Sequence, residues 1–424
     1  MALVGMNFNY YYSSFRFYFS LLFCCGFILF FPFPYYTFPE VGTYFEPTIR
    51  PLVHWTGVHL LNIHEPFTSE LMSDSSGLYV FVFLLAIFSL IGAIVLSSII
   101  KPELKSKIAF WFYTFLAYYL ALTLLKYGAD KIFKHQFYLP EPNTLFTPIG
   151  QTTPDLLYWT SMGSSYSYSV FSGIIEIIPA LFLLFRKTRL LGILISIAIL
   201  CNVVMINFGF DITVKVYSLF LLFIAIVLVS QHLKPLYQFF ILKEKTSQSE
   251  SDFQLDSTKK LLVYTITKTL FFGLILFETF GIYFATNNLN DDKADRPLLY
   301  GAYEVFHYVE DGQIYPATIT FPNRIRRIFF HRREYLILQT MDDRFIDYKY
   351  SFDKYNEWIT LSSAHTLSGE SKTSRLNYTI YKDELSLRGY FNGKGITCYS
   401  KKIDISQLPL LREKMHWTIE SFVE

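Results

Sequence analysis

Long apolar runs separated by short polar stretches dominate residues 1–285. The pattern is clearest in residues 166–230, where apolar runs at 166–185 and 190–208 flank a short basic turn and a third run follows at 213–230. A helix of about 20 apolar residues is long enough to cross the hydrocarbon core of a bilayer. The pattern therefore predicts a membrane hairpin followed directly by a third transmembrane helix.

Four further runs have the same character and raise the predicted number of spans to seven. Three of them precede the hairpin and one follows it: residues 17–31, 77–100, 108–125 and 261–285. The first run lacks the small-residue cleavage site of a signal peptide, so we interpret it as an uncleaved span. Between the first two spans, residues 51–63 are apolar enough for a short interfacial or re-entrant helix, with Trp55 at the depth of the lipid headgroups.

The pattern changes from about residue 297, where charges return and apolar residues become intermittent. Seven strand-length runs rich in β-branched and aromatic residues follow: 326–331, 335–341, 344–350, 358–361, 376–381, 385–390 and 396–401. Asn392-Gly393 lies between the last two runs, and Asn-Gly is a strong hairpin signal. Seven or eight short strands predict an antiparallel meander, closed as a small barrel or folded as a sandwich.

These patterns predict a helical membrane bundle of about seven spans followed by a soluble antiparallel β domain. We expect five segments along the chain: a two-span segment with an outer loop at 1–107, a four-span core at 108–235, a polar linker at 236–260, the seventh span at 261–286 and the β domain at 297–424. The linker is expected on the cytoplasmic side. The outer side of the membrane would then carry the β domain.

Composition supports a membrane protein and excludes some functions. The 424 residues are 52% hydrophobic and 17% charged, whereas average soluble proteins carry about 25% charged residues. The formal net charge of +2 is too small to indicate a nucleic-acid partner. The four cysteines include no C-x-x-C pair, and we interpret them as free thiols with packing roles.

Lysines and arginines near the spans predict the orientation. With a cytoplasmic N-terminus, the inside loops hold twelve of them: Arg16, Lys101, Lys105, Lys107, Arg186, Lys187, Arg189, Lys234, Lys243, Lys245, Lys259 and Lys260. The outside loops between spans hold three, which are Arg50, Lys131 and Lys134. Because positive residues favour the cytoplasmic side, we expect a bacterial cytoplasmic (inner) membrane protein with its N-terminus inside and its β domain outside the cytoplasm.

Ionisable side chains interrupt several predicted spans. Such residues are costly in hydrocarbon and usually face a protein interior or a water-filled cavity. Glu176 lies near the middle of its span, and Gly173, three residues earlier on the same face, would let a neighbouring helix approach. Counting from the cytoplasmic turns places four other charged residues near the outer ends of their spans, in two pairs with a spacing of four: Lys126 with Asp130, and Asp211 with Lys215.

One polar cluster opening outward is therefore a hypothesis for a site. Its candidate catalytic residues are Glu176, Asp211 and Lys215. Its candidate substrate-binding residues are Lys126, Asp130, Asn202 and Asn207. One alternative is that these residues only hold the helices together through buried pairs and amide hydrogen bonds. Another is that they are unrelated surface positions.

No metal site is expected from the sequence. His54, His59 and His64 recur every five residues, so on a helix they would point about 140° apart from one to the next. No nucleophile–base pair and no phosphate-binding loop stands out either. The polar residues of the spans are thus the main candidates for chemistry.

Four stretches around these residues resemble the DoxX-like membrane proteins, and the longer members from Gram-negative bacteria are the most similar. The stretches are residues 126–131, the Gly173-x-x-Glu176 motif leading into 179–185, the basic turn 186–189, and the string Asn-Val-Val-Met-Ile-Asn-Phe-Gly-Phe-Asp-Ile-Thr-Val-Lys at 202–215. The resemblance covers about residues 108–234 and implies a four-helix membrane core. The chain departs from the short members in its extra spans, its added β domain and its lack of paired external cysteines.

The resemblance implies a link to redox chemistry. Some DoxX-like proteins are similar to subunits of thiosulfate:quinone oxidoreductase, others are linked to thiol and redox homeostasis, and a more distant likeness joins the vitamin K-dependent carboxylase group. A quinone is the cofactor that this implies, with Glu176 or Asp211 exchanging the protons that accompany its reduction. No haem, flavin or metal motif is present, so electrons would come from a redox or cell-envelope protein partner.

A second function class fits the same sequence. The protein could be a non-catalytic membrane scaffold or assembly factor whose β domain binds a partner. The two classes differ in whether the polar residues of the spans do chemistry. The sequence leaves open whether the protein is an enzyme.

Overall fold

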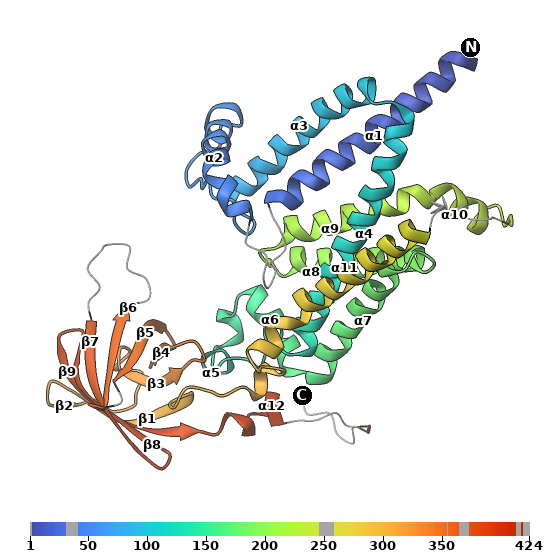
Figure 1. Ribbon diagram of the computed structural model, residues 1–424. Coiled ribbons are helices and arrows are strands. Elements are labelled where there is room, and N and C mark those ends of the chain that lie inside the picture. Colours follow the sequence, from blue (N-terminus) through green and yellow to red (C-terminus); the bar gives the residue numbers. More distant parts are fainter. Residues whose placement is uncertain are drawn as a thin grey trace. The chain divides into compact units, whose positions relative to one another are not determined.

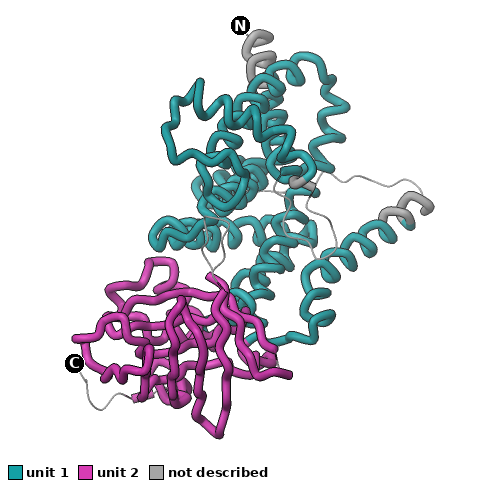
Figure 2. Tube along the Cα trace, turned by 90° about the vertical axis from the view of Figure 1, so that its left-hand side faces the viewer, with its two compact units in different colours: residues 1–136, 167–291 teal, residues 137–166, 292–424 magenta. Residues whose placement is uncertain are grey.

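The chain folds into two compact units. The computed structural model describes residues 2–30, 41–245, 258–353, 355–363, 373–412 and 417–418. Unit 1 consists of Met1–Gln136 and Ser167–Asp291, and unit 2 of Phe137–Tyr166 and Asp292–Glu424 (Figure 2). Residues 246–257 of the predicted linker lie outside the described ranges.

Within the described residues, seven helices are long and apolar enough to cross a membrane. They are α1 (Ala2–Phe30), α3 (Ser76–Ile99), α4 (Pro102–Ile132), α7 (Tyr166–Leu184), α8 (Arg189–Gly209), α9 (Lys215–Val229) with its continuation through η3 (Ser230–His232) and α10 (Leu233–Phe240), and α11 (Thr258–Ala285) (Figure 1). The prediction of about seven spans is confirmed.

Contacts between helix ends agree with seven successive crossings. Seven crossings place the ends of α4 and α11 on one side of the membrane, and the starts of α1 and α4 on the other. On the first side, His135 Nε2 lies 3.0 Å from the carbonyl oxygen of Asn288. On the second side, Lys105 Nζ donates to Ser14 Oγ at 2.9 Å. Both contacts therefore join ends that the crossings put together.

Two glycines allow α4 and α7 to pack backbone to backbone. A Cβ added to Gly128 would lie 2.7 Å from the carbonyl oxygen of Gly173, and a Cβ on Gly173 would lie 2.5 Å from that of Gly128. Real side chains do not tolerate such distances, so both positions require glycine. The close approach expected at Gly173 is confirmed, and it brings the polar side chains of the two helices within reach of each other.

The loop between α1 and α3 contains a helix that the sequence predicts only in part. It comprises α2 (Val41–Trp55) and a π-helical turn, η1 (Thr56–Leu60). The apolar pattern predicts a helix that begins at residue 51, whereas Pro47 and Pro51 both lie inside α2. Phe45, Leu52 and Trp55 lie on one exposed face of this helix, while Val53 is fully buried.

The described part of unit 2 has nine strands, eight of which close into an antiparallel barrel. The strands are β1 (Gly301–Glu310), β2 (Gln313–Ile314), β3 (Ile325–Phe330), β4 (Tyr335–Thr340), β5 (Phe345–Asp353), β6 (Trp358–Ser363), β7 (Thr373–Tyr381), β8 (Glu384–Phe391) and β9 (Lys394–Ile403) (Figure 1). Neighbours in sequence pair from β3 to β9, and β1 pairs with both β3 and β9. The β domain is confirmed, and of the two alternatives it is the barrel.

In the barrel, the sequence predicted the hairpin between β8 and β9 but missed strand β1. Asn392 and Gly393 have φ angles of 52° and 84°, as the predicted tight hairpin between β8 and β9 requires. Strand β1 is not among the predicted runs. Its register shifts between Val305 and His307, and such a bulge breaks the alternation by which a strand is predicted.

The segment between α4 and α7 belongs to the barrel unit. It forms α5 (Pro142–Leu145), η2 (Ile149–Gln151) and α6 (Pro154–Ser164). The Phe146 ring lies 5.6 Å from that of Phe329, and buried Glu141 pairs with Arg332. Arg332 also donates to the carbonyl oxygen of Leu139 at 2.9 Å. Because seven crossings put this loop and the residues after α11 on the same side, the shared unit agrees with the topology.

Candidate functional site

A buried ion pair joins α4 and α7. Lys131 Nζ donates to Glu176 Oε2 at 2.6 Å, and the two side chains are only 9% and 7% exposed. Ser169 Oγ donates to the carbonyl oxygen of Lys131 at 3.0 Å, one turn beyond the contact of Gly128 with Gly173. These contacts show that the two helices run antiparallel.

The antiparallel packing explains why the two charges meet. Side chains on a helix lean toward its N-terminus. Lys131, the penultimate residue of α4, therefore leans back along the helix, and Glu176, the eleventh of the nineteen residues of α7, leans toward it. A lysine near the end of a span commonly extends outward to the membrane surface. Here the ammonium is instead directed inward to a carboxylate, which offsets the cost of burying either charge.

A second polar group links α4 to α11. Lys126 Nζ lies 2.5 Å from Asp130 Oδ1 and 3.0 Å from the hydroxyl oxygen of Tyr283, which itself donates to Asp130 Oδ1 at 2.6 Å. Tyr283 is fully buried. The predicted pairing of Lys126 with Asp130 is thus present, and Tyr283 is a third member that the sequence did not indicate.

A third polar group fixes the start of α9. Lys215 Nζ lies 2.7 Å from Asp211 Oδ1, at the predicted spacing. Asp74, from the loop before α3, accepts hydrogen bonds from the backbone N–H groups of Lys215 at 2.8 Å and Val216 at 3.0 Å. The residue before α9 provides no side-chain cap. Asp74, which is far away in the sequence, instead accepts hydrogen bonds from the free N–H groups of the first turn.

The two candidate asparagines lie on opposite faces of α8. Asn207 is 4% exposed, and its Nδ2 has no hydrogen-bond partner among the described residues. Asn202 is exposed. The candidate residues are thus found around α4–α7, α4–α11, the start of α9 and the two faces of α8. The first two groups are adjacent, because Asp130 and Lys131 are consecutive residues of α4.

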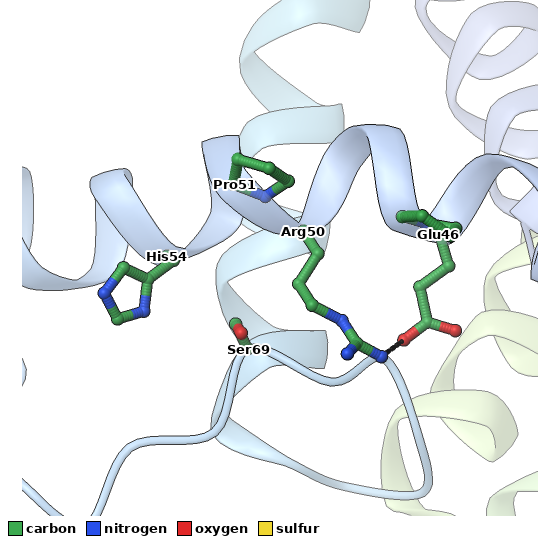
Figure 3. A pocket seen from close by; sticks show the side chains of 6 residues that line it. Glu46, Arg50, Pro51, His54 and Ser69 are labelled. Carbon is green, nitrogen blue, oxygen red and sulfur yellow. Dashed lines mark hydrogen bonds and ion pairs between the residues drawn. The ribbon is translucent and has the colours of Figure 1, made fainter.

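A surface cavity of about 530 Å³ lies beside α2 (Figure 3). It is lined by Glu46, Pro47, Arg50, Pro51, His54 and Ser69. Arg50 donates to Glu46 Oε1 at 2.8 Å, and this hydrogen bond lowers the pKa of the Glu46 carboxyl. The cavity carries both signs of charge. Within the described ranges, no three His, Cys, Asp or Glu side chains gather as metal ligands would, here or elsewhere.

Comparison with known proteins finds a similarity to a bacterial protein. The uncharacterized protein YwoB of Bacillus subtilis is 32% identical over 120 residues, which make up 26% of this chain and 70% of YwoB. No protein-family model matches the chain, and no solved structure matches it significantly. The seven apolar helices fit a membrane protein, and the chain belongs to the same family as YwoB.

Proposed function

We propose that the helical unit is a quinone-linked redox subunit, in which the Lys131–Glu176 pair handles a proton that accompanies quinone reduction. The observation that carries the proposal is the position of Glu176. It is an ionisable carboxyl group near the middle of an apolar span, 6% exposed, and held by a lysine from the neighbouring helix. Ionisable groups in such places commonly mark proton or substrate pathways.

The geometry suits proton transfer. Reduction of a quinone to a quinol takes up two electrons and two protons, and the electrons would come from a protein partner. At 2.6 Å, a proton can pass between Lys131 Nζ and Glu176 Oε2 without a change in the net charge of the pair. Release of a proton from the pair to a quinone would leave an unbalanced buried charge. This imbalance favours uptake of the next proton.

The DoxX-like resemblance supports the same assignment. The stretch at 126–131 and the Gly173-x-x-Glu176 motif contain both members of the pair, and a four-span core at 108–235 would hold the quinone. The Lys126–Asp130–Tyr283 group would position α11 beside this core. The Asp74–Lys215–Asp211 group would hold the start of α9.

An orientation with the N-terminus inside and the barrel outside the cytoplasm is part of the proposal. Of the three positive residues assigned to the outside loops, Lys131 lies within α4 and pairs with Glu176. Lys134 is fully buried. Arg50, which is partly exposed, is then the remaining one of those three, and this sharpens the charge asymmetry that favours this orientation.

Substitution of Glu176 tests the proposal. Glu176→Gln keeps the size and much of the hydrogen bonding of the side chain but cannot ionise. In membrane vesicles, we expect normal abundance of this variant and loss of quinone reduction, measured as the extracted quinol-to-quinone ratio. Glu103→Gln is the matched control, because it makes the same change at an exposed position in the first turn of α4 and should keep activity. Quinone reduction at the normal rate in Glu176→Gln would refute the assignment.

One observation favours the scaffold alternative. The barrel exposes large aromatic side chains, with Phe306, Tyr381 and Tyr390 at 57%, 69% and 73% exposure. Exposed aromatic residues are typical of protein interfaces. If the barrel binds an envelope partner, Phe306→Ser with Tyr390→Ser should abolish co-purification of that partner at normal abundance. Glu176→Gln should then have no effect on function.

A further inference from the structure

One exposed strip of α8 has the spacing of a coiled-coil seam. Its residues are alternately four and three positions apart: Leu191, Ile195, Ala198, Asn202, Met205 and Gly209. Five of them are exposed and Ile195 is partly exposed. The opposite side of the helix is buried, and it consists of Gly192, Ile193, Ser196, Leu200, Val204 and Asn207. A spacing that averages 3.5 residues is the one by which two helices pack along their whole length.

Asn202 is the residue of the strip that needs a partner. It lies thirteen positions after Arg189 and seven before Gly209 in the apolar helix α8, so it is about 10 Å from the nearer helix end. At that depth an exposed amide faces hydrocarbon, where it can no longer hydrogen-bond with water. No hydrogen bond to the Asn202 side chain is found among the described residues. Polar side chains in spans commonly hydrogen-bond across to another helix.

Gly209 gives an independent indication of a close neighbour. A Cβ added there would meet no atom within 4 Å, and its φ is not in the left-handed region. Gly192, on the buried side, differs, since its Cβ would lie 2.9 Å from the backbone nitrogen of Leu183. Nothing in the described part of the chain requires Gly209 to lack a side chain. A helix from outside the chain would benefit from the space.

We propose that α8 packs along this strip against α8 of a second copy, with the two Asn202 amides hydrogen-bonded to each other across a two-fold axis. Copies inserted in the same direction have parallel α8 helices, and a parallel pair places each seam residue opposite its own counterpart. An amide carries both a donor and an acceptor, so it can bond its own twin.

The spacing also identifies the position of the asparagine in the seam. Met205 follows Asn202 by three residues and Ala198 precedes it by four, which makes Asn202 an a position. A single asparagine at an a position fixes the register and the two-stranded state of a parallel coiled coil, at some cost in stability. The neighbouring d positions, Ala198 and Met205, hold a small alanine and a flexible methionine. The amide contact is therefore the specific element of this interface.

Disulfide cross-linking in native membranes tests the proposal with the full chain. Cys25 and Cys201 are exposed, whereas Cys24 and Cys398 are buried, so Cys25→Ser with Cys201→Ser gives the background. Single changes on the seam are Ala198→Cys and Met205→Cys. Their matched controls are Ile199→Cys and Val203→Cys, which lie off the seam at partly exposed positions of the same helix. We expect severalfold more covalent dimer from the seam positions than from the controls.

A second substitution isolates the amide contact. Asn202→Leu in the Ala198→Cys background should lower the yield of dimer severalfold at equal membrane abundance, whereas Asn202→Gln should keep part of it. Equal yields on and off the seam would overturn the proposal. So would an unchanged yield in Asn202→Leu. If no position forms dimers but Asn202→Leu abolishes quinone reduction, the amide binds a quinone from the lipid, and the second copy is excluded.

Discussion

The helical unit and the barrel distribute polar and apolar side chains in opposite ways. In the barrel, Leu385 and Leu387 point inward and are buried, while Glu384 is exposed. In the helical unit, Met205 is 68% exposed and Glu176 is 6% exposed. The barrel has the arrangement expected when water surrounds a protein, and the helices have the one expected when lipid does.

Burial of apolar side chains therefore contributes differently to stability in each unit. In water, removing apolar surface from the solvent is the main source of stability. In lipid, the surroundings are as apolar as leucine, so helices associate through close packing and polar contacts instead. In the helical unit, the close Gly128–Gly173 contact and the Lys131–Glu176 pair hold helices together. In the barrel, buried apolar side chains have this role.

The largest effect that tests this comparison is expected in the barrel core. Phe330 is fully buried, and its ring contacts those of Tyr303 and Tyr350 at 5.8 and 5.4 Å. Phe330→Ala should cost about 3–5 kcal/mol of stability, because it removes apolar contacts and leaves a cavity. Amide hydrogen exchange of β3 and β4 in the detergent-solubilised full chain measures the loss. Phe208→Ala, at an exposed position of α8 outside the strip, is the matched control, and an equal loss there would contradict the expected difference between the two units.

A pH-dependent loss of stability is expected next, again in the barrel unit. Burial, and then the charges of Arg332 and Arg333, lower the pKa of His331 from 6.5 to about 4. A depressed pKa means that the folded state prefers the neutral ring. The contribution of the neutral ring to stability is therefore complete above pH 6.5. As the pH falls toward 4, this contribution is lost and the free energy of unfolding decreases by at most about 3 kcal/mol.

This effect is measured as the difference in the free energy of unfolding between the wild-type chain and His331→Gln, followed from pH 7 to 4.5. The difference is needed because Glu141 lies 3.6 Å from His331 and has a pKa raised chiefly by burial. A raised pKa gives the opposite dependence, with stability lost as the pH rises. If both chains show the same slope, His331 is not held neutral in the folded barrel.

The sequence predicted the elements of both units better than it predicted their contacts. Strands such as β8 were predictable because buried and exposed residues alternate, and the spans because apolar runs of this length are rare outside membranes. The partner of Glu176 was harder to identify. Lys131 ends a long run, so counting charges assigned it to a loop, whereas the direction of side chains on an antiparallel helix pair turns it inward.

Contacts between distant segments left no local signal. Asp74 precedes Lys215 by 141 residues, and nothing near either residue indicates the other. Tyr283 lies in an apolar run, where a tyrosine is an ordinary packing residue. Glu141 belongs to a turn-rich connection between spans, yet it pairs with a barrel arginine. Pairings of this kind depend on how the chain packs in three dimensions, so hydrophobic periodicity does not reveal them.

A moderate effect is expected where the helical unit meets water. Asp74 caps α9 through two backbone hydrogen bonds, and loss of such a cap typically costs about 1 kcal/mol. Asp74→Ala should therefore increase hydrogen exchange in the first turn of α9. Asp74→Asn should change it little, because an amide oxygen also accepts these bonds. If Asn is as damaging as Ala, the charge beside Lys215 matters more than the cap.

The smallest effect is expected for a polar contact inside the helical unit. Hydrogen bonds between helices in membranes contribute about 0.6 kcal/mol on average and about 1.7 at most, because polar groups also find partners before the helices assemble. Tyr283→Phe removes one hydroxyl from the Lys126–Asp130 group without changing the shape of the ring. Thermal unfolding in detergent should therefore shift by no more than this contact is worth, far less than for Phe330→Ala. The reverse ranking would show that α11 is held to α4 by this polar group as firmly as the barrel is held by its core. The polar contact would then contribute as much to stability as apolar burial does in the barrel, which contradicts the difference between the two units described above.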